Sequence, residues 1–563
     1  MAMDGLTLRA WRWWLPLLGV LLVFPLSSYG TAVDYHQRSI TFAMSQEPPD
    51  LNTLTSTDAV SGMILGHVME GLMRYNLQGE LVGGVAERWQ LRDDGATFWL
   101  RTDARWSDGS PVTAHDFVFA WQQALLPATA SEYASILFPL TNAQAINDGR
   151  LEVSALGARA LDEYTLEVSL HQPCPYFLGL TAFRTLFPVK QTFYEAKGSR
   201  YAANAGDLLY NGPFALARWV HGASLRMDKN PHYWNREQTW LNRIDVPYIT
   251  EDTNARMNLY RDGKIAMAND LNAESLGGAL RDRMQIKSFL DGAIFYLEFN
   301  HRDGRATANK NLRKAIQTVF NTDDLVYKVM GSPGTFPVYT LFPRWMRGED
   351  DFFVREFPPQ KPQLDVQRGR EYITAAKQDL GVERIPPITL LADDTPTGQK
   401  AAEYLQTLLK QTLDLDVRVD MQIFKQRLAK MGSGDFDLVV AGWGPDYDDL
   451  LTYADLFVSH NMNNRGRYHG KAYDHWVQVA QSTLDAQERL QAFAHLQQIL
   501  FDDVVIVPLY ERGQVYVQHG RLHGVMRRAL GGDPNFNYAT IDPPETDQAK
   551  VQFQQQSQVQ RQE

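Results

Sequence analysis

Cysteine is almost missing from this sequence: Cys174 is the single one among 563 residues. No intramolecular disulfide can therefore form, and zinc ribbons, CxxC redox motifs and cysteine-ligated clusters are excluded. Cys174 stands between two prolines in HQPCPYF. This setting favours a buried small apolar side chain over a catalytic thiol.

Basic residues are also few, since 55 Lys and Arg face 66 Asp and Glu, for a formal net charge of −11 at pH 7. Phosphate contacts need an excess of Lys and Arg, and the chain has no long basic run. We therefore expect no nucleic-acid partner.

Catalytic signatures are absent as well. We find no G-x-S-x-G elbow, no H-E-x-x-H motif, no Walker A loop and no G-x-G-x-x-G after a strand. His469 and His475 are close in sequence, but such a pair is more often structural than a metal site. We expect no catalytic residue, no metal ligand and no cofactor. A secreted hydrolase is kept as a less favoured alternative.

Long hydrophobic runs are confined to the N-terminus, where two arginines precede the apolar stretch LPLLGVLLVFPL and the small residues SSYGTA follow it. A membrane-spanning helix needs about 20 apolar residues, and this stretch is shorter. The pattern predicts a secretory signal peptide over 1–32, cleaved after Gly30 or Ala32. The mature protein is then expected outside the cytoplasm.

What is present is the composition of a globular protein, with 44% hydrophobic and 21% charged residues. A chain of this length exceeds one ordinary core, so two to four domains are expected. ITLLAD and LDVRVDMQ around a helix near 397–411 indicate an α/β unit, and FDLVVAGW (436–443) reads as a buried strand. The Gln-rich segment 546–563 predicts a disordered tail.

Local patterns predict two helices. Thr113 and Asp116 in PVTAHDF have the spacing of a capping box at the start of a helix. Apolar residues from Val60 to Leu72 keep helical spacing, which predicts a second helix there.

A long ordered match then appears in GVAERWQLRDDGATFWLRTDARWSDGSPVTAHDFVFAW, residues 84–121. It resembles the signature region of extracytoplasmic solute-binding protein family 5, the oligopeptide- and dipeptide-binding proteins of ABC importers. NGPFAL (211–216), NPHYW (230–234) and FDLVVAGWGPDYDD (436–449) come next in the family's order. Similar segments extend over about residues 40–540.

The resemblance implies an α/β fold: a two-lobed periplasmic-binding-protein clamp of class II, with three subdomains and mixed β-sheets. Hinge crossings are expected near residues 285 and 515. The implied parts are lobe 1 subdomain I (33–69, 191–288 and 515–545), an inserted subdomain II (70–190) and lobe 2 (289–514).

It also implies where a ligand binds. In family members that take peptides with a free N-terminus, an Asp shortly after a Gly-Trp pair binds the α-ammonium. The matching residues here are Gly442, Trp443 and Asp446. A buried ammonium needs a carboxylate partner, and ligands lie beyond the carboxyl ends of strands in α/β sheets. The alternative is that Asp446 only closes a turn. Asp448 and Asp449 are expected to be solvated or to cap a helix.

Three further positions match residues on or near the ligand in relatives: Tyr133, Tyr296 and Glu298. Each could equally be core or hinge packing. Gly442 is expected to leave room for a peptide backbone. The match fails at Val440, where some oligopeptide binders carry an Arg that meets the peptide carboxylate. The ligand's C-terminal end is then held differently, or the ligand is not a standard short peptide.

The resemblance implies the substrate-binding component of a peptide ABC transporter. We expect a monomer that captures short peptides in a closing cleft and delivers them to the permease subunits. The alternatives are the same fold binding a metal chelate, haem, opine or oligosaccharide, or a receptor or chaperone role without transport.

Overall fold

The computed structural model describes residues 31–544. The predicted signal peptide lies outside this range except for its last two residues, and the predicted tail lies wholly outside it. Among the described residues, no helix has the length and apolar character that crossing a membrane requires.

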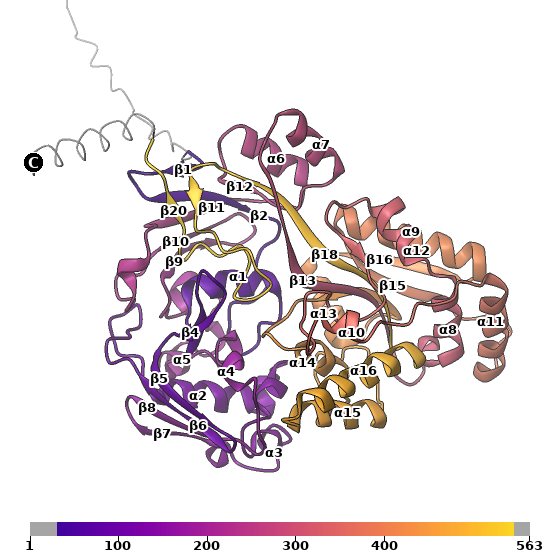
Figure 1. Cartoon of the computed structure of the whole chain (residues 1–563), viewed down its shortest axis with the longest axis horizontal. Coiled ribbons are helices and arrows are strands. Elements are labelled where there is room, and N and C mark those ends of the chain that lie inside the picture. The colour runs from indigo at the N-terminus through magenta and orange to yellow at the C-terminus, as the bar shows by residue number, and fades with distance from the viewer. Residues whose placement is uncertain (1–30, 545–563) are drawn as a thin grey trace, which may run out of the picture.

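Three larger β-sheets organise the chain (Figure 1). The first has five strands, in the order β1 (Val33–Asp34), β2 (Ser39–Met44), β11 (Arg243–Ile249), β10 (Ser224–Lys229) and β9 (Phe214–Val220). The second has four antiparallel strands, in the order β5 (Ala86–Arg92), β6 (Gly95–Leu100), β8 (Thr165–Ser169) and β7 (Ala158–Asp162).

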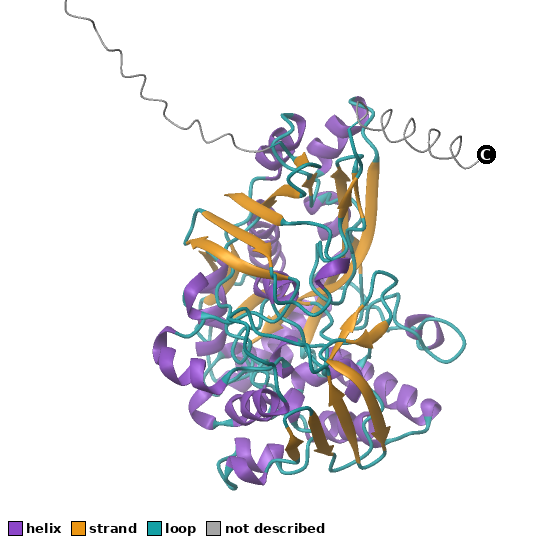
Figure 2. Cartoon of the chain, turned by 90° about the vertical axis from the view of Figure 1, so that its left-hand side faces the viewer, coloured by secondary structure: helices purple, strands orange, loops and turns teal. Residues whose placement is uncertain are grey.

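The third sheet has seven strands. Its order is β12 (Met267–Ala268), β18 (Ile506–Gln518), β13 (Ile286–Phe299), β17 (Leu438–Trp443), β15 (Ile388–Asp393) and β16 (Val417–Gln422), with β14 (Phe336–Pro337) paired to β18. Two small ribbons join β3 (Met73–Tyr75) to β4 (Leu81–Gly83) and β19 (Leu522–His523) to β20 (Thr540–Ile541). Figure 2 shows the strands in separate groups.

Parallel and antiparallel pairs coexist in the first and third sheets, which confirms the expected mixed α/β fold. The name lobe 2 denotes the part around the seven-stranded sheet, and lobe 1 denotes the part around the other two.

Helices lie against these sheets. The first along the chain are α1 (Ala59–Val68), α2 (Ala114–Leu125), α3 (Ala143–Asn147), α4 (Phe177–Leu180), α5 (Gln191–Lys197), α6 (Thr253–Arg261), α7 (Ala273–Arg281) and α8 (Lys310–Val319). The later ones are α9 (Thr322–Asp324), α10 (Phe353–Glu356), α11 (Val366–Leu380), α12 (Pro396–Leu413), α13 (Phe424–Ser433), α14 (Leu451–Ala454), α15 (Lys471–Ser482) and α16 (Ala486–Asp502).

Local chemistry explains how α2 begins. Its capping box is present, because the Asp116 side chain accepts the Thr113 backbone N–H at 2.9 Å. Asp116 also accepts the indole N–H of Trp106 at 3.1 Å, which ties the preceding turn to the helix. The predicted helix start is therefore confirmed.

The helix predicted from Val60 to Leu72 is shorter in the structure, since α1 ends at Val68. Tertiary contacts compete for the backbone there. Asn211 donates to the Glu70 carbonyl at 2.8 Å and accepts the Glu70 N–H at 3.0 Å. Leu72 is fully buried, but it lies outside the helix.

β13 and β18 form the longest strand pair, with 14 and 13 residues. They pair antiparallel from Ile286 opposite Val517 to Glu298 opposite Ile506. Figure 1 shows this pair running between the two halves of the molecule. The predicted hinge crossings near 285 and 515 fall at one end of the pair. The hinge and the domain boundaries stay predictions.

Candidate functional site

A pocket lies between the two lobes, lined by residues of segments 133–180 and 443–481. The space between its walls, including the part open to solvent, is about 440 Å³. Three of the six predicted ligand residues line it: Tyr133, Trp443 and Asp446. Neither lobe alone supplies both walls.

Asp446 enters the pocket directly after strand β17. The strand ends at Trp443, and the chain turns through Gly444 and Pro445. The Asp446 backbone N–H donates to the Thr452 hydroxyl at 2.9 Å, which fixes the turn. Its Oδ1 accepts the Tyr133 hydroxyl of the other lobe at 3.0 Å. Lobe 2 therefore holds the backbone of Asp446, and lobe 1 holds its side chain.

The Asp446 carboxylate lacks a direct counter-charge. Within the described residues it forms no ion pair, and burial raises its pKa to about 7, against the opposing effects of Arg184 and the Tyr133 hydrogen bond. The Arg184 guanidinium donates to the Ser56 carbonyl at 3.1 Å and lies over the Phe183 ring. A cation entering the pocket would meet an acceptor that protein contacts have not neutralised.

Aromatic rings form the wall beside Asp446. The Tyr133 ring lies 5.8 Å from the Trp443 ring and 4.8 Å, edge-on, from the Phe183 ring, measured between centroids. The indole Nε1 of Trp443 is buried and has no hydrogen-bond partner in the described part of the chain. Buried donors are nearly always paired, so an acceptor from a ligand would satisfy this one.

The other three predicted residues do not line the pocket. Gly442 lies opposite Phe295 on β13, and a Cβ there would stand 2.8 Å from the Phe295 ring. The glycine thus makes room for an aromatic side chain of the protein itself. Tyr296 is buried edge-on against Phe457, with centroids 5.8 Å apart. A ligand role for Gly442 and Tyr296 stays a prediction.

Glu298 is 2% exposed and accepts the Gly466 backbone N–H at 2.6 Å. Burial raises its pKa to about 7, although nearby arginines oppose the shift. This geometry connects β13 to the loop before α15. Contact between Glu298 and a ligand also stays a prediction.

The two acids next to Asp446 differ from each other. Asp448 is exposed, as expected. The expectation that Asp449 is solvated was wrong: Arg489 of α16 donates to both of its carboxylate oxygens at 2.7 Å. Asp449 also accepts the Leu451 N–H at 2.9 Å, from one position before Leu450, the N-cap residue of α14. It therefore fixes the turn that carries Asp446.

Sequence reasoning missed a second carboxylate in the pocket. Asp455 follows α14 and begins a short 3₁₀ turn, Asp455–Phe457. Its partners are two amides, Asn461 Nδ2 at 3.3 Å and Gln481 Nε2 at 3.5 Å. Burial raises its pKa to about 7. The signal available in the sequence was a lone acid inside the apolar stretch LLTYADLF.

Direct contacts close the lobes on each other. The Glu132 carboxylate of lobe 1 accepts Arg465 Nη2 of lobe 2 at 2.6 Å, and the Glu132 carbonyl accepts Asn463 Nδ2 at 3.0 Å. We call these three residues the interlobe clasp. Nearby, the Tyr176 and Tyr447 rings stack with centroids 5.6 Å apart.

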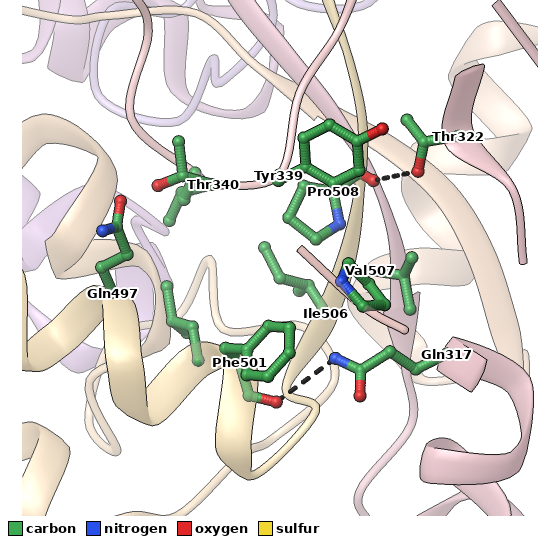
Figure 3. Close-up of a pocket in the computed structure, with 12 residues that line it drawn as sticks. Gln317, Thr322, Tyr339, Thr340, Gln497, Phe501, Ile506, Val507 and Pro508 are labelled. Carbon is green, nitrogen blue, oxygen red and sulfur yellow. Dashed lines mark hydrogen bonds between the residues drawn. The ribbon is translucent and has the colours of Figure 1, made fainter. Parts of the chain in front are cut away.

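Figure 3 shows a second cavity, of about 430 Å³, inside lobe 2. Two polar side chains of its wall are already bonded to backbone carbonyls, Gln317 to Phe501 at 3.3 Å and Thr322 to Pro508 at 3.4 Å. No charged side chain and no predicted site residue lines it. The pocket between the lobes is therefore the better candidate for a charged ligand.

Two other sequence expectations concern reactive groups. Cys174 is buried, as expected, and burial raises the pKa of its thiol to about 12. Across residues 31–544, no three His, Cys, Asp or Glu side chains are grouped so that they could hold a metal ion.

A family profile, a sequence relative and a solved structure all match the same class of bacterial solute-binding proteins. The profile described as "Bacterial extracellular solute-binding proteins, family 5 Middle" matches residues 80–465. The periplasmic oligopeptide-binding protein OppA of Salmonella typhimurium is 31% identical over 79% of this chain and 81% of its own. The structure of Listeria monocytogenes OppA bound to peptide superposes with a TM-score of 0.84 at 30% identity, covering 90% of this chain and 100% of that one.

Two structures of one relative, MppA, allow the arrangement of the lobes to be compared. A structure of the Escherichia coli murein tripeptide binding protein MppA gives a TM-score of 0.81 at 27% identity, over 90% of this chain and 99% of that one. The unliganded open form of MppA gives 0.59 at the same identity, over 91% and 98%. The lobes of the present structure are therefore not arranged as in that open form, in agreement with the interlobe clasp.

The two pocket carboxylates predict a pH-dependent stability of the ligand-free protein. The raised pKa of Asp446 and Asp455 favours their protonated forms in the folded state, so stability falls as pH rises from about 4 through about 7. Asp446→Asn or Asp455→Asn mimics the protonated form. Each should raise the free energy of unfolding, measured by denaturant titration, by roughly 2–4 kcal/mol at pH 8. The gain should be clearly smaller at pH 5, which lies only slightly above the pH at which the carboxyl ionises in the unfolded chain.

Asp93→Asn, at an exposed turn, is the control for this measurement. A gain of equal size at both pH values, or in the control as well, would contradict the assignment. Arg184 and the Tyr133 hydroxyl face Asp446 in the wild type and in the Asn variant alike, so they do not account for a difference.

The interlobe clasp predicts a loss of ligand affinity without any ligand contact. The ion pair between Glu132 and Arg465 joins the two lobes, so it can form only in the closed arrangement. Glu132→Gln removes the carboxylate of this pair. The closed form should become less populated, and apparent affinity should fall at least about fivefold. Titration calorimetry checks this. Asp351→Asn breaks an exposed pair with Arg355 inside lobe 2 and should leave affinity unchanged.

Proposed function

This chain belongs to family 5 of the bacterial extracellular solute-binding proteins, the non-enzymatic substrate-binding components of ABC importers, and we propose that its solute is a short peptide with a free N-terminus. It would bind the peptide between its lobes and deliver it to the permease subunits as a monomer. The predicted signal peptide would export it to the periplasm.

The observation that carries this proposal is the Asp446 carboxylate in the pocket between the lobes. A peptide's α-ammonium is the cation that this acceptor lacks. Pairing the two compensates for the desolvation of both groups, because a charge-assisted hydrogen bond replaces the water that each loses. The Tyr133 hydroxyl occupies Oδ1 and orients the carboxylate.

A second group suits a peptide backbone. The Trp443 Nε1 donor is buried and has no partner among the described residues. A peptide carbonyl next to the ammonium would accept this hydrogen bond whatever the side chain. Recognition through ammonium and backbone allows one site to accept many sequences.

The charge of the pocket argues against three of the non-peptide ligands considered above, namely haem, an opine and an oligosaccharide. Asp446 and Asp455 both line it, and neither has an ion-pair partner among the described residues. An anionic haem or opine would meet repulsion there, and a neutral oligosaccharide would leave both carboxylates without a counter-charge. A cationic group on the ligand avoids both costs.

The first test is direct identification of the natural ligand. The protein is purified without denaturation from the cells that produce it, and small molecules released by acid are analysed by mass spectrometry. Peptides with unmodified N-termini are expected. A sugar, haem or metal chelate in their place would overturn the peptide assignment.

The second test is Asp446→Ala, which should weaken binding of a free-amine tripeptide by roughly 2–5 kcal/mol, because it removes one member of a buried charge pair. The N-acetylated tripeptide should bind weakly to wild type and variant alike. Asp448→Ala changes an exposed acid of the same turn and is the matched control. Equal affinity of wild type and Asp446→Ala for the free amine would reject the role of Asp446.

A further inference from the structure

Asp455 is a second carboxylate in the pocket, and the peptide ammonium at Asp446 does not account for it. It faces the pocket from the 3₁₀ turn after α14. Its two side-chain partners are amides of Asn461 and Gln481, at 3.3 and 3.5 Å, and no described residue forms an ion pair with it. Long contacts to neutral amides compensate poorly for burying a charge.

The fold brings Asp455 into the same space as Asp446. The Thr452 hydroxyl accepts the Asp446 N–H at 2.9 Å, so α14 folds back beside the turn after β17. Asp455 comes one turn later, and its charge contributes to raising the pKa of Asp446. The two carboxylates therefore act on one cavity and on each other.

Apolar side chains also line this cavity. Ile136 and Leu180 of lobe 1 and Leu456 of lobe 2 belong to its walls. Such walls suit the methylene stem of a long basic side chain, whose charged end then reaches an acceptor. A short side chain would leave Asp455 without a counter-charge, and an acidic one would bring a like charge to it.

We propose that Asp455 is the subsite for a basic side chain on the first residue of the bound peptide, lysine or arginine. This rests on the proposed function, since it takes the α-ammonium to be anchored at Asp446. The peptide then presents two cations at its N-terminal end, and each meets one carboxylate. The first residue is assigned because its side chain branches from the same carbon as the anchored ammonium.

The test compares three tripeptides by titration calorimetry on ligand-free protein: Lys-Ala-Ala, the same peptide with Nε-acetyl-lysine, and Ala-Lys-Ala. Acetylation keeps the side chain and removes its charge. Wild type should bind Lys-Ala-Ala about tenfold or more tightly than either of the others. Asp455→Asn should bring the ratio of Lys-Ala-Ala to its acetylated form close to one. Asp448→Asn should leave that ratio as in wild type.

Each contrary result of this calorimetry would overturn a different part of the proposal. Equal affinity for the charged and acetylated peptides in wild type rejects the subsite, and this result does not depend on whether any variant folds. A preference that survives Asp455→Asn rejects Asp455 as its cause. Tighter binding of Ala-Lys-Ala rejects the first-residue assignment. Failure of all three peptides to bind wild type rejects the peptide function itself.

Discussion

The cleft depends on one physical constraint: the Asp446 carboxylate is removed from water and has no counter-charge among the described residues. Asp446 is held in position by a hydroxyl from each lobe, yet no cation of the described chain pairs with it. An ionised group in this state costs several kcal/mol until it is protonated or meets a cation. In the ligand-free protein this cost appears as the raised pKa of Asp446, about 7, and the cation of the proposed ligand would remove it on binding.

The same constraint explains why the site needs two lobes. Lobe 2 supplies Asp446 and Trp443 at the end of β17, while lobe 1 supplies Tyr133, which closes the pocket and orients the carboxylate. Glu132 and Arg465 hold the lobes together close by. The long β13 and β18 strands run between the two halves (Figure 1). Binding and closure are therefore coupled through one small region.

Local sequence patterns predicted several helices and strands, and contacts between distant residues explain the failures. The capping box before α2 was found because its two members are three residues apart. The end of α1 was missed because Asn211, far along the chain, takes over the backbone of Glu70. The solvated state expected for Asp449 is wrong because its partner Arg489 lies on a later helix.

The sequence by itself determined the family, the mixed α/β fold and the position of the Gly-Trp step, because these depend on ordered motifs and local hydrophobic patterns. Tertiary structure decided the state of each acid in and after that step: Asp446 bonded to Tyr133, Asp448 exposed, Asp449 paired with Arg489, and Asp455 facing the same pocket. The charge state of a carboxylate depends on its burial and its nearest partners. Those partners come from helices and loops that only folding brings together, so no local pattern could assign them.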